Sequence, residues 1–215
     1  MEADSRTPGM DRKYAWVPMM LIGLTLGVFS HASSGLPGAW RWVGNLGALW
    51  LAIAFLVGRL AANLRGGALV GAASLAVASV IHYVPHRMLR EGISLHAFRW
   101  PVILWVVVGA TVGLLFGTLG AAHARRLRIY AALGVALLVA AFAAEALVLL
   151  RIGHARAMQV AVPIEVIAAL AWPFVLMSSW KARLTTYLVA AAFAPILVLA
   201  LASFMGVIHR VYPGV

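Results

Sequence analysis

The sequence contains no cysteine, few charged residues and no long polar segment. The lack of cysteine excludes disulfide bonds, thiolate metal sites and a cysteine nucleophile, although it leaves the compartment open. Charged residues make up only 11% of the 215 residues, and hydrophobic residues make up 64%. A soluble domain has roughly 25% charged residues. A chain of this composition requires lipid as its solvent.

Acidic residues are especially scarce, at 6 against 17 lysines and arginines, and the net charge is +11. In a soluble protein this excess would suggest nucleic acid binding. Here the basic residues lie between apolar runs, as in membrane proteins that anchor at anionic headgroups. No RNA- or DNA-reading motif is present. We therefore expect membrane lipids as partners and no nucleic acid, whereas the sequence does not indicate an oligomeric state.

Seven apolar runs approach the length of a transmembrane helix, which needs about 20 mostly apolar residues. We predict an all-α integral membrane bundle of about seven transmembrane helices, forming a single domain over residues 1–215. Residues 1–14 are a polar N-terminal tail. Residues 85–100 are expected to form an interfacial loop, which is either a lid over a pocket or an ordinary amphipathic connector. The seven runs cover residues 16–32, 42–62, 66–84, 101–122, 129–150, 160–178 and 185–208.

The basic residues also give an orientation. With seven spans, ten basic residues lie on the side of the N-terminus (side A) and seven lie on the other side (side B). The positive-inside rule then places the N-terminus in the cytoplasm of a multi-pass cell-membrane protein. No small-residue cleavage site follows the first run, so we expect a retained helix and not a removed signal peptide.

Glycines recur every four positions in three of the runs. Small residues at this spacing let helix backbones approach closely in lipid. We therefore expect these glycine stripes to lie at contacts between helices. They are Gly23 and Gly27, Gly67 and Gly71, and Gly109, Gly113 and Gly117.

Only two acidic residues, Glu145 and Glu165, lie within the apolar runs. An ionisable group at such a position is a functional-site hypothesis by default. Both lie roughly 8–9 Å below side B at 1.5 Å per residue, so they are expected to share one pocket. Two carboxyls in a dry pocket would not both ionise, and one would keep a proton that it can donate. The alternative is structural bonding to a neighbouring helix, or pairing with Arg151 or Arg156.

Further side chains are expected to line this pocket and bind a substrate. Trp172 is seven residues after Glu165 and thus lies on the same helical face, two turns deeper. Its indole could stabilise a cation, or it packs against lipid or a neighbouring helix. The other expected substrate-binding residues are Phe142, Trp50, Asn45, His82 and His86.

His82 and His86 are four residues apart, a spacing that puts two imidazoles on one helical face. This spacing suits a metal ion, but two ligands are too few to hold one. We expect no metal and no cofactor, and the alternative for both residues is an interfacial position near water and headgroups.

The segment GNLGALW at residues 44–50 resembles a family of small actinobacterial membrane proteins of unknown function. The resemblance continues through most of the chain and implies no activity. Its further matches are Ala54, Phe55, Gly58, Phe116, Gly117, Gly120 and Glu145.

The tripeptide Pro-Ile-Glu at residues 163–165 is similar to the Pro-x-Glu motif of small membrane lycopene cyclases, which start cyclisation by protonating an alkene. Those enzymes usually have a second acid directly after the first, where this chain has Val166. Fungal membrane meroterpenoid cyclases also have several spans and use acids. Their Trp-Glu pair in the second span corresponds here to Trp50 followed by Leu51.

These features together predict an integral membrane terpene cyclase of the isomerase or lyase type. A buried acid, Glu165 or Glu145, would protonate a lipid-soluble polyprenyl substrate. The sequence has no Asp-rich motif that could hold magnesium and a diphosphate, which argues against ionisation-started chemistry. Two alternatives stay open, namely a small-molecule-binding subunit of a membrane transporter and a non-catalytic structural membrane protein.

Overall fold

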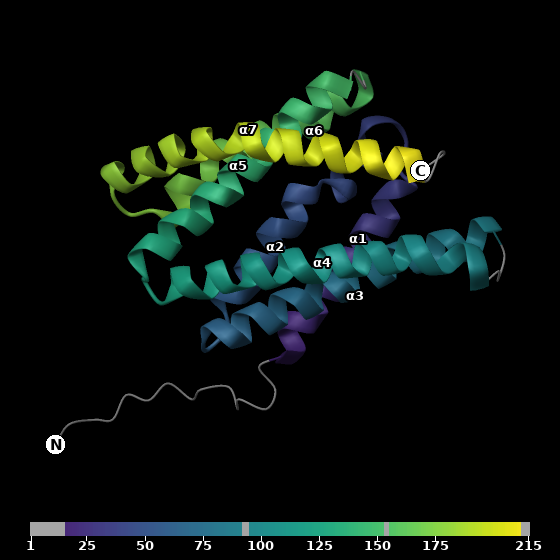
Figure 1. The fold of residues 1–215 in the computed structure, drawn as a ribbon, viewed down its shortest axis with the longest axis horizontal. Helices are drawn as coiled ribbons and strands as arrows, with labels where there is room; N and C mark the ends of the chain where they lie inside the picture. The colour runs from purple at the N-terminus through teal and green to yellow at the C-terminus, as the bar shows by residue number, and fades with distance from the viewer. Residues whose placement is uncertain (1–15, 92–94, 153–154, 212–215) are drawn as a thin grey trace.

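The computed structural model describes residues 16–91, 95–152 and 155–211, and this part of the chain is almost entirely helical (Figure 1). The all-α prediction is thereby confirmed, whereas the predicted N-terminal tail lies outside the described residues. Each of the seven predicted runs overlaps an α-helix, and a 3-10 helix, η1, precedes α2. The elements are α1 Trp16–Ser34, η1 Gly38–Asn45, α2 Gly47–Arg59, α3 Leu64–Glu91, α4 Leu95–Ala124, α5 Arg128–Ile152, α6 Ala155–Leu176 and α7 Trp180–Val211.

The helices have the length and composition of membrane spans. Five of them, α3 to α7, are long and apolar enough to cross a bilayer, and η1 with α2 makes a sixth span if the bent pair is counted as one. The apolar part of α1 is shorter. Five to six such helices indicate a multi-pass membrane protein.

The helices form two groups, with α2 between them (Figure 1). In one group α3 packs against both α1 and α4, and in the other α5 packs against both α6 and α7. The middle helix α2 contacts α3, α4 and α5. Its Phe55 is fully buried, as are Val135 and Leu138 of α5. The core is therefore centred where α2 meets α5.

The predicted glycine stripes lie where helix backbones meet. Gly71 of α3 lies against Gly113 and Gly117 of α4, and Gly67 also lies against Gly117. Gly58 of α2 meets the backbone of Gly117 as well. Three helices therefore approach one another at Gly117, and a side chain there would collide with backbone atoms.

The second apolar run is not the continuous helix that the sequence predicts. Leu46 has an extended backbone (φ −67°, ψ 115°), and it separates η1 from α2, which are bent by 40°. Gly44 and Gly47 flank this break, and glycine weakens a helix relative to alanine by about 1 kcal/mol. The apolar composition of the run hides the break, because Leu46 is as hydrophobic as its neighbours.

The predicted interfacial loop at residues 85–100 is largely helical. Helix α3 continues to Glu91, and α4 begins at Leu95. Residues 92–94 lie outside the described part. Pro85 lies inside α3, and transmembrane helices tolerate proline where neighbouring groups satisfy the freed backbone.

Replacing Gly117 by alanine tests the three-helix contact. The added methyl group would meet the backbone of Gly67 and Gly71, and overpacking of this kind typically costs about 1–3 kcal/mol. We expect Gly117→Ala to lower the Tm in detergent. The matched control is Gly206→Ala on α7, where no atom lies within 4 Å of the added carbon, and its Tm should not fall. Equal Tm values for the two variants would contradict the contact.

Candidate functional site

Glu145 of α5 binds the N-terminus of α2. Its two carboxyl oxygens accept hydrogen bonds from the backbone N–H groups of Gly47 (2.8 Å) and Ala48 (2.6 Å). The N-cap residue of α2, Leu46, makes no side-chain cap bond. Free N–H groups and the positive end of the helix dipole attract an anion at this position. Since both oxygens act as acceptors, the geometry suits an ionised carboxylate.

Glu165 of α6 has a different environment. Its side chain is 0% exposed, and in the described part of the chain neither carboxyl oxygen has a hydrogen-bond partner. The carboxyl of Glu145 lies within electrostatic range of it. A second bare negative charge beside the first, in an apolar interior, would be costly. The arrangement therefore suits a protonated Glu165 beside an ionised Glu145.

The two acids come together because α5 and α6 pack against each other as consecutive helices. Glu145 lies near the end of α5, which runs to Ile152, and Glu165 lies within the first turns of α6, which starts at Ala155. Both therefore lie at a similar depth on one side of the bundle, as counting residues along the helices predicts.

A groove of about 790 Å³ lies beside this pair of acids. Residues of α1, η1, α2, α5 and α6 line it. Among the described lining residues Thr25 is the one with a hydroxyl, and it donates that hydroxyl to the carbonyl of Leu21 in the same helix (2.8 Å). Two lining residues, Phe29 of α1 and Val175 of α6, are 45% and 72% exposed. The groove is thus apolar throughout and opens sideways between α1 and α6.

Glu165 lies behind the wall of the groove and not on it. Ala168 and Trp172 line the groove from the same helix, one and two turns further along. Phe142 of α5 also lines it, and its ring centroid lies 6.3 Å from that of Trp172. The indole Nε1 of Trp172 is buried and has no hydrogen-bond partner among the described residues. Two of the predicted substrate-binding residues, Phe142 and Trp172, are therefore on the groove beside the acid.

Three other predicted substrate-binding residues lie outside the groove lining. His82 Nδ1 lies 2.9 Å from Ser30 Oγ, and its ring makes an edge contact with Trp50 at 6.1 Å. The Asn45 amide donates to the backbone carbonyl of Arg41 at 3.0 Å. The Trp50 indole donates to a carbonyl six residues earlier at 3.2 Å. These contacts connect η1, α1, α2 and α3, and they give the three residues structural partners.

The remaining predicted residue, His86, falls in α3, but its side chain lies outside the described residues. The sequence reasoning missed the backbone N–H groups of Gly47 and Ala48, although two glycines in the short segment GNLG are a sign of a helix break. It also missed the contribution of α1 to the groove. Phe29 carries no signal for this role, because an apolar residue in an apolar run is unremarkable.

A family model for a family of unknown function (DUF6518) matches residues 9–207. This bears out the expected resemblance to an uncharacterised family, whereas nothing in the match supports the likeness to terpene cyclases. No curated protein and no solved structure matches the chain.

The two acids offer a matched pair of substitutions that separates the cap from its neighbour. Glu145→Gln places an amide NH₂ against one of the two N–H groups, and losing a hydrogen bond to a charged group costs about 1.5–3 kcal/mol. We expect a lower Tm in detergent for this variant. Glu165→Gln is the control, because its oxygens make no bond in the described structure, and its Tm should hardly change. A larger loss in Glu165→Gln would show that the cap is not the stabilising contact.

Proposed function

Because the chain belongs to the DUF6518 family, whose function is unknown, we propose a function from its site, namely that of an integral membrane terpene cyclase. A polyprenyl alkene or epoxide occupies the groove, and Glu165 starts cyclisation by donating its proton. The observation that carries the proposal is a fully buried carboxyl without a hydrogen-bond partner in the described structure, directly behind the wall of an apolar groove.

The groove supports a hydrocarbon substrate. Within the described part of the chain its lining offers no cation and no free hydroxyl that could hold a diphosphate. Its sideways opening between α1 and α6 would let a substrate enter from the bilayer, where polyprenyl chains dissolve. Small-molecule pockets in proteins are typically lined by apolar side chains with a few precisely placed polar groups, and this groove has the apolar lining of such a pocket.

The contacts of the two acids favour Glu165 as the proton donor. Glu145 holds the N-terminus of α2 with both oxygens, an arrangement that suits its ionised form better than a proton donor. Protonation of an alkene by Glu165 would leave a carbocation, and the ring faces of Trp172 and Phe142 could stabilise it. The Glu165 carboxylate could then recover a proton when the cyclised cation becomes an alkene. Atoms and charges balance, and the net reaction is an isomerisation.

Removal of the acidic proton tests this role. Glu165→Gln keeps size and polarity but cannot act as an acid, and positioned proton transfer is worth about 10²–10⁴-fold in rate. We expect purified Glu165→Gln to lose most turnover of a panel of polyprenyl alkenes and epoxides, measured by product chromatography. Glu165→Asp should keep part of it, because the acid remains but is withdrawn by one methylene group.

A smaller loss in Glu145→Gln than in Glu165→Gln, once both are compared at equal folded concentration, would agree with this assignment. Full turnover in both variants would exclude proton-initiated cyclisation by these acids.

A second candidate function is a small-molecule-binding subunit of a membrane transporter. The observation in its favour is the break at Leu46, because discontinuous helices with their N-termini at a site inside the membrane are typical of transporter substrate sites. Such a subunit would retain an unchanged isoprenoid on purification, which native mass spectrometry would detect. An enzyme would release a cyclised product in detergent without a partner protein.

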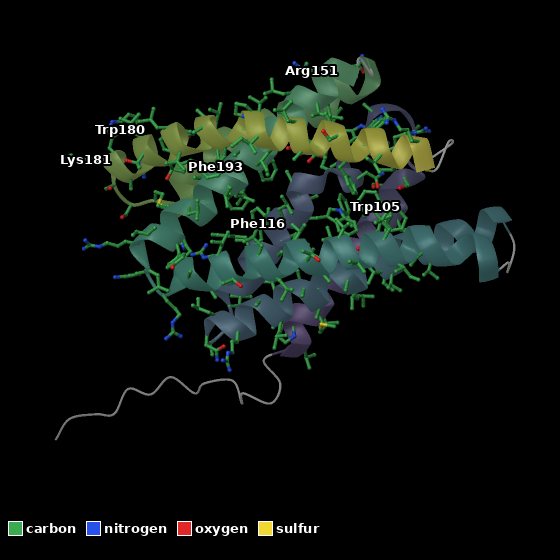
Figure 2. All side chains as sticks on the ribbon, viewed as in Figure 1. Trp105, Phe116, Arg151, Trp180, Lys181 and Phe193 are labelled. Atoms are coloured by element: carbon green, nitrogen blue, oxygen red, sulfur yellow. The ribbon has the colours of Figure 1, made fainter. Side chains whose placement is uncertain are left out.

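We also propose that the chain crosses the membrane seven times with a cytoplasmic N-terminus. Helix α1 packs alongside the spanning helix α3, because Gly23 lies against Ser74 and Gly27 lies against Ala78. The two helices thus run in the same direction over at least a full turn. Figure 2 shows Trp180 and Lys181 at the left end of the bundle, at the start of α7, and Arg151 away from them near the junction of α5 and α6, as expected for residues that flank spans.

Reporter fusions at the two ends of the chain test this topology. An odd number of crossings places the termini on opposite sides, so a fusion at Met1 and a fusion at Val215 should give opposite signals. A reporter that is active only in the cytoplasm should work at Met1 and fail at Val215. The same signal from both ends would mean six or eight crossings.

A further inference from the structure

Glu165 is sealed off from the groove that runs beside it. Its side chain is 0% exposed, yet the groove-lining residues Ile164 and Ala168 lie on either side of it in α6. Glu165 is therefore next to the groove lining along α6 but is covered on the groove side. The side chain of Ala168 is small, and Phe142 of α5 and Trp172 of α6 are the aromatic residues that these two helices contribute to the groove lining.

No polar contact from a described residue holds these two aromatic side chains in place. The indole Nε1 of Trp172 makes no hydrogen bond in the described part of the chain, so the ring can turn without breaking one. Phe142 contacts Trp172 with a ring tilt of 40° at 6.3 Å between centroids. Both rings face the groove on one side, where space is available for them to move.

We propose that Phe142 and Trp172 form a gate between the groove and Glu165, and that lipid-soluble molecules reach the carboxyl through it from the bilayer. Glu165 is then a site for apolar, carboxyl-directed reactants that enter between α1 and α6. The natural occupant depends on the proposed cyclase function, but the route to the acid does not.

A lipid-soluble carbodiimide, dicyclohexylcarbodiimide, tests the route without a known substrate. A protonated carboxyl adds across a carbodiimide to give an O-acylisourea, which rearranges to a stable N-acylurea, and no group leaves. The full-length protein in phosphatidylcholine vesicles would be treated with the reagent. Peptide mass spectrometry would then give the rate at which each glutamate gains the added mass.

The gate predicts labelling at Glu165 and little at Glu145, whose oxygens are occupied. Phe142→Ala should increase the rate at Glu165 several-fold. The matched control is Phe116→Ala. It truncates a similarly buried phenylalanine of α4, labelled in Figure 2, that is not among the residues lining the groove, and its rate should match that of the wild type. Equal rates in wild type and Phe142→Ala would overturn the gate, as would faster labelling by a water-soluble carbodiimide.

A second variant covers the case in which Phe142→Ala fails to fold. Ala168→Leu removes no buried side chain and narrows the groove next to the acid, so it should slow labelling at Glu165 below the wild-type rate. An unchanged rate would argue against the groove as the route. Accelerated labelling without any turnover would leave the gate standing and the cyclase proposal rejected. If turnover depends on Glu165 but the labelling rate is unchanged by the substitutions at Phe142 and Ala168, the cyclase proposal would stand and the gate would be rejected.

Discussion

The bond between the Glu145 carboxylate and the N-terminus of α2 is the interaction on which the rest of the site depends. Inside a bilayer every backbone polar group must find a partner within the protein, so a helix can begin within a span only where an acceptor is available for its first N–H groups. Glu145 supplies two oxygens to Gly47 and Ala48. This contact makes the break at Leu46 tolerable.

The break in turn shapes the groove and distinguishes the two acids. Val43 of η1, Leu46 at the break and Leu49 of α2 all line the groove, and a straight helix through this region would direct these side chains differently. Both oxygens of Glu145 accept hydrogen bonds from N–H groups of α2. Glu165 is therefore the acid whose carboxyl makes no hydrogen bond in the described structure. One carboxylate therefore holds the start of α2 beside the groove, and its negative charge favours the neutral form of Glu165.

Much of this arrangement could be predicted from the sequence. Bilayer thickness sets the length of a spanning apolar run, so the helices can be recognised in the sequence. Counting residues along α5 and α6 then places Glu145 and Glu165 at a similar depth. The break at Leu46 was not predicted, because its stabilising partner is distant in the chain and the local residues are apolar. A pocket lined by Phe142 and Trp172 was predicted, but the contribution of α1 to it was not, since that depends on how α1 and α6 lie relative to each other and not on any residue pattern.

Gly47 and the carboxylate that caps it are 98 residues apart in the chain. Ribosomes add about 5–20 residues per second, so α2 emerges roughly 5–20 s before Glu145 exists. During that interval its leading N–H groups have no acceptor from α5, and each unsatisfied group costs several kcal/mol in hydrocarbon. The nascent second helix therefore needs water or the polar interior of the insertion machinery around its start. On this argument α2 can leave that polar environment for lipid only after α5, which carries Glu145, has been synthesised.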